Sequence, residues 1–563
     1  MSLHKLSLIL IGNLLIGSAA IAQSDAYLVQ FKDKPTAVRS SEILSKKSIA
    51  RRAKFEIPLT TEDQPVCHVY KTAIEQIDST IFRYALKWHN GIVINASQTA
   101  ISEIAELTFV EKIMYVGKAE IPLNIEKPQF ITPVAKLKES TIRTDNLLPE
   151  DYGMAYTQNK QIQTTELHRN GYDGKGVTIA VFDAGFNAID KIPSFLKHQA
   201  NGLLTFGFDI AGLDNILNTK DNHGTAVTSC IGSYHKGKFI GGAPMAHLIL
   251  FRTECASTEY PIEELNWCKA AELADSTGVD IISSSLGYNQ YDDTSLNYTH
   301  KDLDGKTSYS SKAARIASQK GIIVLNSAGN SGGNQWRKIG TPSDVAAVLT
   351  VGAADKNGKP GNFSSHGYNA LGEIKPDISA MGVLASVASP SGSYYQGYGT
   401  SYSTPIAAGG VACLVQAFPE THPDIIKQAI RITASQSMIP DSFVGYGIAQ
   451  LNTAAELVLL KKQGVVLPKI MSTTQNFVNV YTGNTNIIEY QVFQHRKFLL
   501  LFNTKKKVAE GKNKSRMSFY RINLSESSLK CSKRYSIKIN LKSSSDTYVL
   551  KISESYNCLN LTK

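Results

Sequence analysis

The chain contains the stretch GYGTSYSTPIAAGG at residues 397–410. Its glycines allow a sharp turn, and the small, apolar residues from Ala407 onward suit a buried helix. Pro405 fits an early helical turn, where its missing N–H is no loss. Ser401 therefore lies where a loop enters a helix, near free backbone N–H groups and the positive end of the helix dipole. A hydroxyl at this place is either a helix cap or a nucleophile whose oxyanion meets donors already in position.

Two further stretches favour the nucleophile. VTIAVFDAG at residues 177–185 is typical of a buried parallel strand, with Asp183 at its carboxyl end, where open α/β sheets bind ligands. HGTAV at residues 223–227 predicts a second helix that begins with a histidine. An Asp, a His and a Ser, each at the end of an element beside glycine, are the parts of a charge-oriented nucleophile. Their joint appearance favours catalysis over three separate structural roles.

At these residues the chain resembles the subtilisin-like serine peptidases, the subtilases. The resemblance implies that Asp183 orients the base, that His223 is the general base and that Ser401 is the nucleophile. A fourth motif, NSAGNSG at residues 326–332, follows the apolar run GIIVL. In that family the last Asn of this motif, here Asn330, donates its side-chain amide to the oxyanion. The resemblance covers roughly residues 150 to 455.

Three neighbours of the motif residues depart from the family pattern. Tyr402 and Ser403 follow the nucleophile where Met and Ala are usual, and Ala184 follows the aspartate where Ser or Thr is usual. These positions flank the reacting groups, so we expect changes in local packing rather than in the reaction. A rival hypothesis is a catalytically dead subtilase that binds partner proteins.

Hydrophobic runs and helical stretches alternate through residues 152–460, which we assign to the peptidase domain. This alternation predicts an α/β fold with three layers: a mostly parallel, subtilisin-like sheet with helices on both faces. A helix is expected at 262–276. Strands are expected at 177–181, 247–251, 279–283, 322–325 and 348–351.

The SSLG segment at residues 284–287 resembles the family segment that pairs with an extended substrate backbone. The same resemblance implies a specificity pocket whose walls are residues 285–287 and 327–329 and whose base lies near Gly340. Its residues are Ser285, Leu286, Gly287, Ala328, Gly329 and Gly340. None of them is charged, so we expect a preference for neutral, large apolar side chains just before the cut bond.

Residues 1–22 read as a secretory signal peptide, which predicts a secreted or cell-surface protein. Residues 23–125 predict a small α+β unit, with strands at 27–31, 92–96 and 110–116 and a helix near 100–107. Its position between a signal and a peptidase resembles that of the inhibitory propeptides of subtilases. The resemblance implies an intramolecular inhibitor that shields the active site until it is cut away. Residues 126–151 are expected to form the linker and processing region.

Residues 471–563 predict a small C-terminal β-sandwich with strands at 477–481, 487–493, 535–539 and 547–552. This region resembles the C-terminal sorting domains of type IX secretion at INLS (522–525) and YVLK (548–551). It would then engage that secretion machinery; the alternative is an ordinary accessory β domain. It holds 16 Lys or Arg and 5 Asp or Glu, so it carries the whole formal excess of +11. The charge of the rest is balanced, the candidate active site lies in a neutral stretch, and we expect peptide or protein substrates and no nucleic acid.

The 563 residues and seven cysteines constrain the remaining expectations. The length suits three or four domains, and the cysteines form no metal-ligand pattern. Cys255 and Cys268 either pair in an exported protein or are two separate buried thiols, while Cys230 and Cys413 are expected in the core. Calcium often stabilises subtilases, but no acidic loop commits to it, so we expect no metal site and no cofactor.

Overall fold

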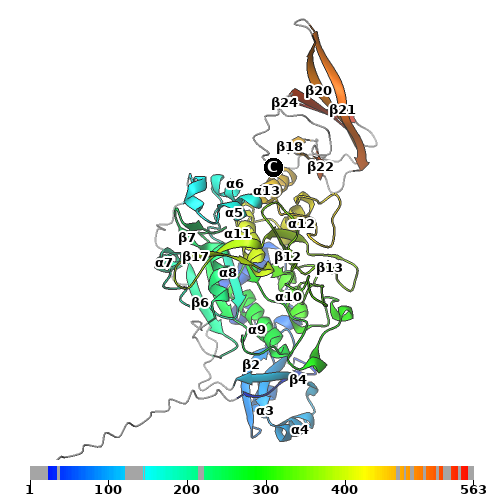
Figure 1. Ribbon diagram of the computed structural model, residues 1–563. Coiled ribbons are helices and arrows are strands. Elements are labelled where there is room, and N and C mark those ends of the chain that lie inside the picture. The colour runs from blue at the N-terminus through cyan, green and yellow to red at the C-terminus, as the bar shows by residue number, and fades with distance from the viewer. Residues whose placement is uncertain are drawn as a thin grey trace, which may run out of the picture.

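The computed structural model describes residues 23–34, 39–120, 144, 146–213 and 221–463, together with strands between 469 and 555 (Figure 1). The expected signal peptide and most of the expected processing region lie outside the described residues. The described chain contains an N-terminal domain, a central domain and a set of C-terminal strands. No helix in these described ranges is long and apolar enough to cross a membrane.

The central domain is built on a seven-stranded sheet with the strand order β15-β12-β11-β10-β5-β9-β6. Every neighbouring pair is parallel. The expected strands are all present with shifted ends, and the two edge strands, β6 and β15, were not predicted. The strands are β5 (Thr178–Asp183), β6 (Leu204–Asp209), β9 (His247–Arg252), β10 (Ile281–Ser284), β11 (Ile323–Ser327), β12 (Leu349–Ala354) and β15 (Ile378–Met381).

Helices cover both faces of this sheet, as predicted for the three-layer fold. Successive side chains of a strand point to opposite faces, so Val181 of β5 packs in one apolar cluster and Phe182 in the other. The first cluster holds α8 (His223–Gly232) and α11 (Thr400–Ala417), and α5 (Tyr156–Gln161), α6 (Thr164–Arg169), α12 (Pro423–Thr433) and α13 (Leu451–Lys462) extend this layer. The second cluster holds α9 (Pro261–Thr277) and α10 (Tyr309–Gln319). Cys230 and Cys413 are buried in α8 and α11, as expected.

The N-terminal domain is an antiparallel sheet in the order β2-β3-β1-β4, with helices on one face. Ile74 and Ile104 from its helices pack on Val29 and Ile94 of the sheet. The α+β prediction is confirmed, with further elements that the pattern did not indicate. The elements are β1 (Gln23–Phe31), α1 (Ser40–Ile43), α2 (Lys46–Lys54), α3 (His68–Glu75), β2 (Thr80–Leu86), β3 (Gly91–Ala96), α4 (Gln98–Ala105) and β4 (Val110–Glu120).

The other face of this small sheet packs against α9 of the central domain, below it in Figure 1. Leu28, Trp88 and Val116 share one buried cluster with Trp267 of α9. The two domains therefore continue one hydrophobic core, and water is excluded from the sheet face that meets α9.

A buried charge network joins the two domains beside this apolar contact. Arg51 and Arg52 of α2 donate to opposite oxygens of Asp275 at 2.6 and 2.7 Å. Arg52 also binds Asp63 at 2.8 Å, and Lys320 of the central domain reaches the same carboxylate at 2.8 Å. The five side chains are at most 4% exposed. Each charge therefore depends on the others for the hydration it has lost.

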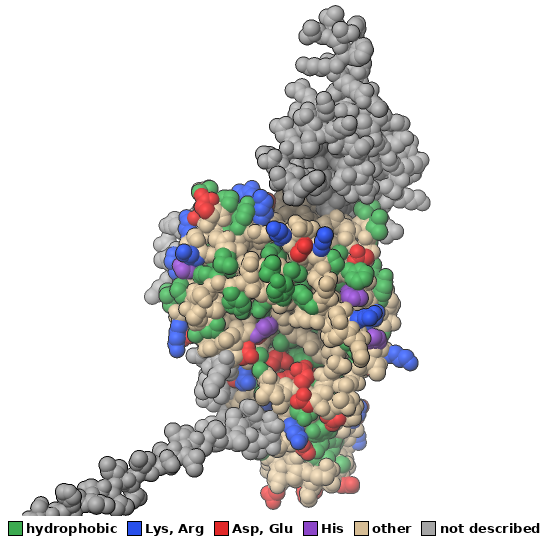
Figure 2. All heavy atoms as spheres, viewed as in Figure 1, with side chains coloured by type: hydrophobic (Ala, Val, Ile, Leu, Met, Phe, Trp, Pro, Cys, Tyr) green, Lys and Arg blue, Asp and Glu red, His purple; other side chains and the backbone are tan. Residues whose placement is uncertain are grey.

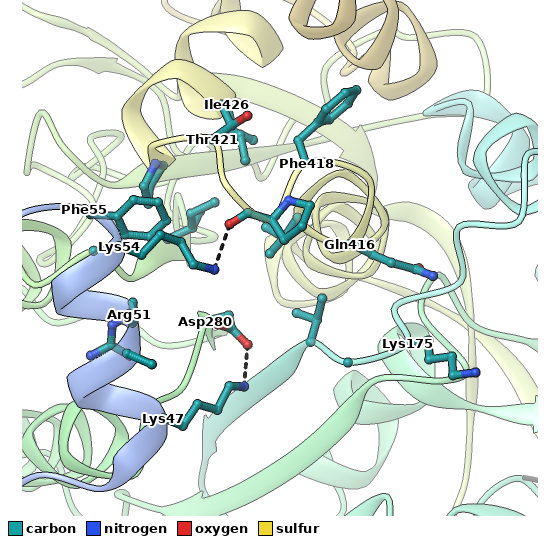
Figure 3. Close-up of a pocket in the computed structure, with 18 residues that line it drawn as sticks. Lys47, Arg51, Lys54, Phe55, Lys175, Asp280, Gln416, Phe418, Thr421 and Ile426 are labelled. Carbon is teal, nitrogen blue, oxygen red and sulfur yellow. Dashed lines mark hydrogen bonds and ion pairs between the residues drawn. The ribbon is translucent and has the colours of Figure 1, made fainter. Parts of the chain in front are cut away.

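A cavity of about 330 Å³ lies between α2 and the central domain (Figure 3). Lys47 pairs with Asp280 at 2.7 Å across it, and Lys54 donates to the Pro419 carbonyl at 2.9 Å. Val177 lines it just before β5 begins. This cavity is thus at the amino-terminal edge of the sheet, opposite the end at which Asp183 lies.

The C-terminal strands form two antiparallel sheets, β18-β19-β22 and β21-β20-β23-β24. The four expected strands are present, and the packing of one sheet on the other stays a prediction. The strands are β18 (Lys469–Thr473), β19 (Phe477–Tyr481), β20 (Ile487–Phe498), β21 (Phe502–Lys514), β22 (Phe519–Asn523), β23 (Arg534–Lys542) and β24 (Thr547–Ser555).

Candidate active site

Three motif residues from distant parts of the sequence lie at the carboxyl edge of the sheet. Asp183 ends β5, His223 begins α8 and Ser401 is in the first turn of α11. Asp183 is fully buried, and both of its carboxylate oxygens are 2.9 Å from His223 Nδ1. The backbone N–H of Ala184 donates to Asp183 Oδ1 at 2.9 Å. The carboxylate is thereby fixed against one edge of the imidazole and leaves its Nε2 edge free for another partner.

The environment of His223 sets its proton affinity. Burial alone lowers the pKa of His223, but the charge of Asp183 and the hydrogen bond to it outweigh burial and raise the pKa above its usual value. The side chain remains 35% exposed, so the ring is accessible from the cleft. A histidine in this setting is a stronger base than a free imidazole.

Ser401 is held by an exchange of hydrogen bonds with Ser285, the residue after β10. Pro405 has no N–H to give to the Ser401 carbonyl four residues earlier, and the Ser285 hydroxyl donates to that carbonyl at 2.8 Å instead. In the described structure the Ser401 hydroxyl donates to the Ser285 carbonyl at 3.4 Å rather than to His223. This bond is long and therefore weak. The hydrogen bond between a catalytic serine and its base is often long or poorly aligned until substrate is bound.

Two observations bring His223 and Asn330 to the start of α11. The rings of His223 and Tyr402 are 6.3 Å apart between centroids. Asn330 Oδ1 accepts from both the N–H and the hydroxyl of Thr400, each at 3.0 Å, which leaves its Nδ2 as a donor toward the cleft. Asn330 and Ser401 line the same cavity. Ser401, His223 and Asn330 therefore lie together at the start of α11, with the buried Asp183 behind the histidine.

That cavity has a volume of about 320 Å³ and includes most of the predicted pocket residues. Ala328 is the exception and corrects the prediction: its side chain is fully buried and packs with Leu303 and Ile339 beneath the pocket. The backbone of Ala328 is fixed against the neighbouring strand β12, because its N–H donates to the Val351 carbonyl at 3.0 Å. The predicted residues that line the cavity are Ser285, Leu286, Gly287, Gly329 and Gly340.

The cavity also has charged residues that the sequence analysis missed. Glu254, Glu259 and Glu263 form one wall, and Lys338 lies among the remaining lining residues. Figure 2 shows acidic side chains gathered on the face of the central domain just above the N-terminal domain. The expectation of a neutral active site is therefore wrong. In the sequence, Glu263 looks like an ordinary acidic residue in the first turn of a helix, where it complements the helix dipole. Glu254 and Glu259 lie in the loop between β9 and α9, where a charged residue is unremarkable, so no signal separated the three.

Burial perturbs all three glutamates of this wall. Desolvation, followed by the repulsion of neighbouring carboxylates, raises the pKa of Glu259 to about 7. Desolvation likewise raises the pKa of Glu254 to about 8 and that of Glu263 well above its usual value. These raised pKa values favour the neutral form of the carboxyls in the absence of a partner, and a cation placed beside them would favour the ionised form.

The structure also bears on metal binding and on the possible disulfide between Cys255 and Cys268. In the ranges that the structure describes, no group of three or more His, Cys, Asp or Glu side chains is arranged to hold a metal ion. Cys255 lies partly exposed in the cavity wall, Cys268 is buried in α9, and the two are not joined by a disulfide. The alternative of two separate thiols is the one that the structure contains.

A parallel sheet with an aspartate, a histidine and a serine at its carboxyl edge is the arrangement of a serine hydrolase. Residues 174–447 match the family model described as "Subtilase family", and residues 26–130 match "Peptidase S8 propeptide domain, Bacteroidota". The chain belongs to the subtilase family. It is a serine endopeptidase that is made with an N-terminal propeptide, as a zymogen.

Curated relatives agree with this membership. Serine protease AprX of Bacillus subtilis (strain 168) is 31% identical over 52% of this chain and 69% of its own length. Subtilisin E of the same strain is 26% identical over 62% of this chain and 82% of its own. The alkaline protease of Shouchella clausii is 25% identical over 65% of this chain and 85% of its own.

Proposed function

We propose that Ser401, His223, Asp183 and Asn330 carry out peptide-bond hydrolysis through an acyl-enzyme. His223 accepts the Ser401 proton as the Ser401 oxygen attacks the carbonyl carbon, and it then protonates the leaving amine. Asp183 fixes the imidazole tautomer and stabilises the cation. The Asn330 side-chain amide and the Ser401 N–H bind the oxyanion. The observation that carries this proposal is the pair of 2.9 Å contacts between His223 Nδ1 and the buried Asp183 carboxylate.

The decisive experiment compares Ser401 with Ser403, which lies two residues further along α11. Ser401→Ala should abolish hydrolysis of peptides and labelling by a fluorophosphonate probe. Ser403 is the matched control, because its hydroxyl is buried and donates to the Thr400 carbonyl at 3.0 Å. Ser403→Ala should keep both activities. Labelling that survives in Ser401→Ala would refute the assignment.

Side-chain preference just before the cut bond is proposed to be neutral and apolar. Leu286, Gly287, Gly329 and Gly340 support this proposal because they present no charge to the cavity. A peptide panel that varies this one position would test it. Strong selection for Lys or Arg at that position would contradict it.

The propeptide is proposed to inhibit the enzyme within the same chain until it is cleaved and released. Its large buried contact with α9 and its charge network support tight docking. The protein is further proposed to be secreted or exposed at the cell surface, on the evidence of the signal-like residues 1–22. Delivery by type IX secretion through residues 471–563 is a proposal from sequence resemblance alone. Deletion of those residues, followed by fractionation of the producing cells, would test it.

A further inference from the structure

The wall formed by Glu254, Glu259 and Glu263 has no role in the reaction proposed above. We propose that these three carboxylates form an acidic subsite of the substrate cleft, which binds a Lys or Arg side chain of the peptide at a position other than the one just before the cut bond. This inference rests on the proposed peptidase function and deepens it, because it names a class of substrate.

Two of the three carboxylates, those of Glu254 and Glu263, are held in place through one oxygen each. Glu254 Oε1 accepts from the Tyr288 hydroxyl at 2.8 Å and from the Thr253 hydroxyl at 2.6 Å. Glu263 Oε1 accepts from the Cys255 N–H at 2.8 Å. Rigid, pre-positioned carboxylates lose little conformational freedom when a ligand binds, which favours affinity.

An unused acceptor remains on this wall. Glu263 is 2% exposed, and its Oε2 has no hydrogen-bond partner among the described residues. A buried carboxylate oxygen without a donor is costly, so a ligand that supplies a donor gains that energy back. An ammonium or guanidinium supplies both the donor and the opposite charge.

The propeptide places two basic residues beside the same wall. Lys118 of β4 and Arg83 of β2 line a small hollow together with Cys255, Thr258 and Glu263, and these last three also line the substrate cavity. The propeptide backbone packs closely against the central domain at this place. Residue 117 is a glycine, and a Cβ there would lie 2.4 Å from the ring of Tyr260. An inhibitor that docks in the cleft is expected to match its charge, and this one is basic at the acidic wall.

The alternative of a metal site is not favoured by the geometry. These carboxylates are not arranged to hold a metal ion in the described structure. The three residues line the cavity wall without the convergent oxygen ligands at short distance that a metal ion needs, so the wall suits an ammonium or guanidinium better.

The test uses the processed enzyme and internally quenched peptides. One neutral parent peptide is varied at each of the positions before the cut bond except the nearest, with Lys or with norleucine as an uncharged match. We expect Lys to exceed norleucine in kcat/KM by about tenfold or more at one position. Glu259→Gln combined with Glu263→Gln should bring this ratio close to one. Glu420→Gln, which changes an exposed carboxylate of the central domain outside the cavity, should leave the ratio unchanged.

The outcomes separate the two proposals. Hydrolysis of the parent peptide with no preference for Lys at any position overturns the acidic subsite and leaves the peptidase assignment intact. A preference that persists in the Glu259→Gln and Glu263→Gln enzyme also overturns it. Hydrolysis that continues in Ser401→Ala refutes the catalytic assignment instead. The ratio compares two peptides with one enzyme preparation, so partial unfolding of a variant does not imitate the expected result.

Discussion

Asp275→Asn tests how the propeptide is held on the catalytic domain. In the native zymogen four cations share the two carboxylates of Asp63 and Asp275: Arg51, Arg52, Lys320 and, more distantly at 3.9 Å, Lys87. The substitution removes one of the two negative charges and leaves four positive charges against a single carboxylate. The Asp275 side chain is fully buried and both arginine side chains are 4% exposed. The small contribution to stability that is typical of solvent-exposed ion pairs therefore does not apply here.

Breaking a buried ion pair from one side typically costs about 3–5 kcal/mol. Arg52 keeps its two bonds to Asp63, and Arg51 keeps those to the Val279 and Lys320 carbonyls, so the lower end of this range is expected. About 3 kcal/mol corresponds to a docking equilibrium weakened roughly 100-fold. The propeptide should therefore open far more often in the variant, while the rest of the core is unaffected.

The assay is hydrogen exchange on the full chain in a Ser401→Ala background, which prevents processing. Amides of α2 should lose protection by roughly 100-fold in Asp275→Asn, and amides of β11 serve as the internal reference. Glu75→Gln is the matched control, because Glu75 forms a partly exposed pair with Lys71 that is worth under about 1 kcal/mol. Equal losses in the two variants would refute the reasoning that burial makes this network strong.

Three further predictions concern the site and its pH dependence. Asn330→Ala should lower kcat by about 10²–10³ with little change in thermal stability, measured on a neutral peptide, because one oxyanion donor is lost. Since Asp183 raises the pKa of His223 above 6.5, the acid limb of kcat/KM should lie above pH 6.5, and Asp183→Asn should move it to lower pH. Burial, together with Lys312 and Lys34, lowers the pKa of His89 to about 3, so propeptide docking should be strongest above pH 6.5 and weaken about tenfold per pH unit below it. Hydrogen exchange of the Ser401→Ala zymogen between pH 4.5 and 7.5 would show this slope, and a His89→Gln variant that kept the full slope would contradict the assignment to His89.

Patterns within single segments were enough to predict much of the fold. The apolar run that ends at Asp183, the helix that begins at His223 and the helix that contains Ser401 were all expected where the structure has them. Each is governed by neighbours in the sequence, through strand burial on both faces or through the turn that opens a helix. The edge strands β6 and β15 were missed because edges are short or interrupted: β6 contains Gly207 and the partly exposed Phe206.

The sequence by itself determined the fold class, the order of the domains and the identity of the candidate reacting groups, because periodicity and short motifs are local properties of the chain. Only the tertiary structure decided what surrounds those groups. Glu254, Glu259 and Glu263 form a wall of the cleft, and Ala328 lies beneath the cleft rather than in its wall. Whether a side chain faces a cavity, a partner or the core depends on how β9, α9 and the loop after β11 pack together, and that packing involves residues far apart in the sequence.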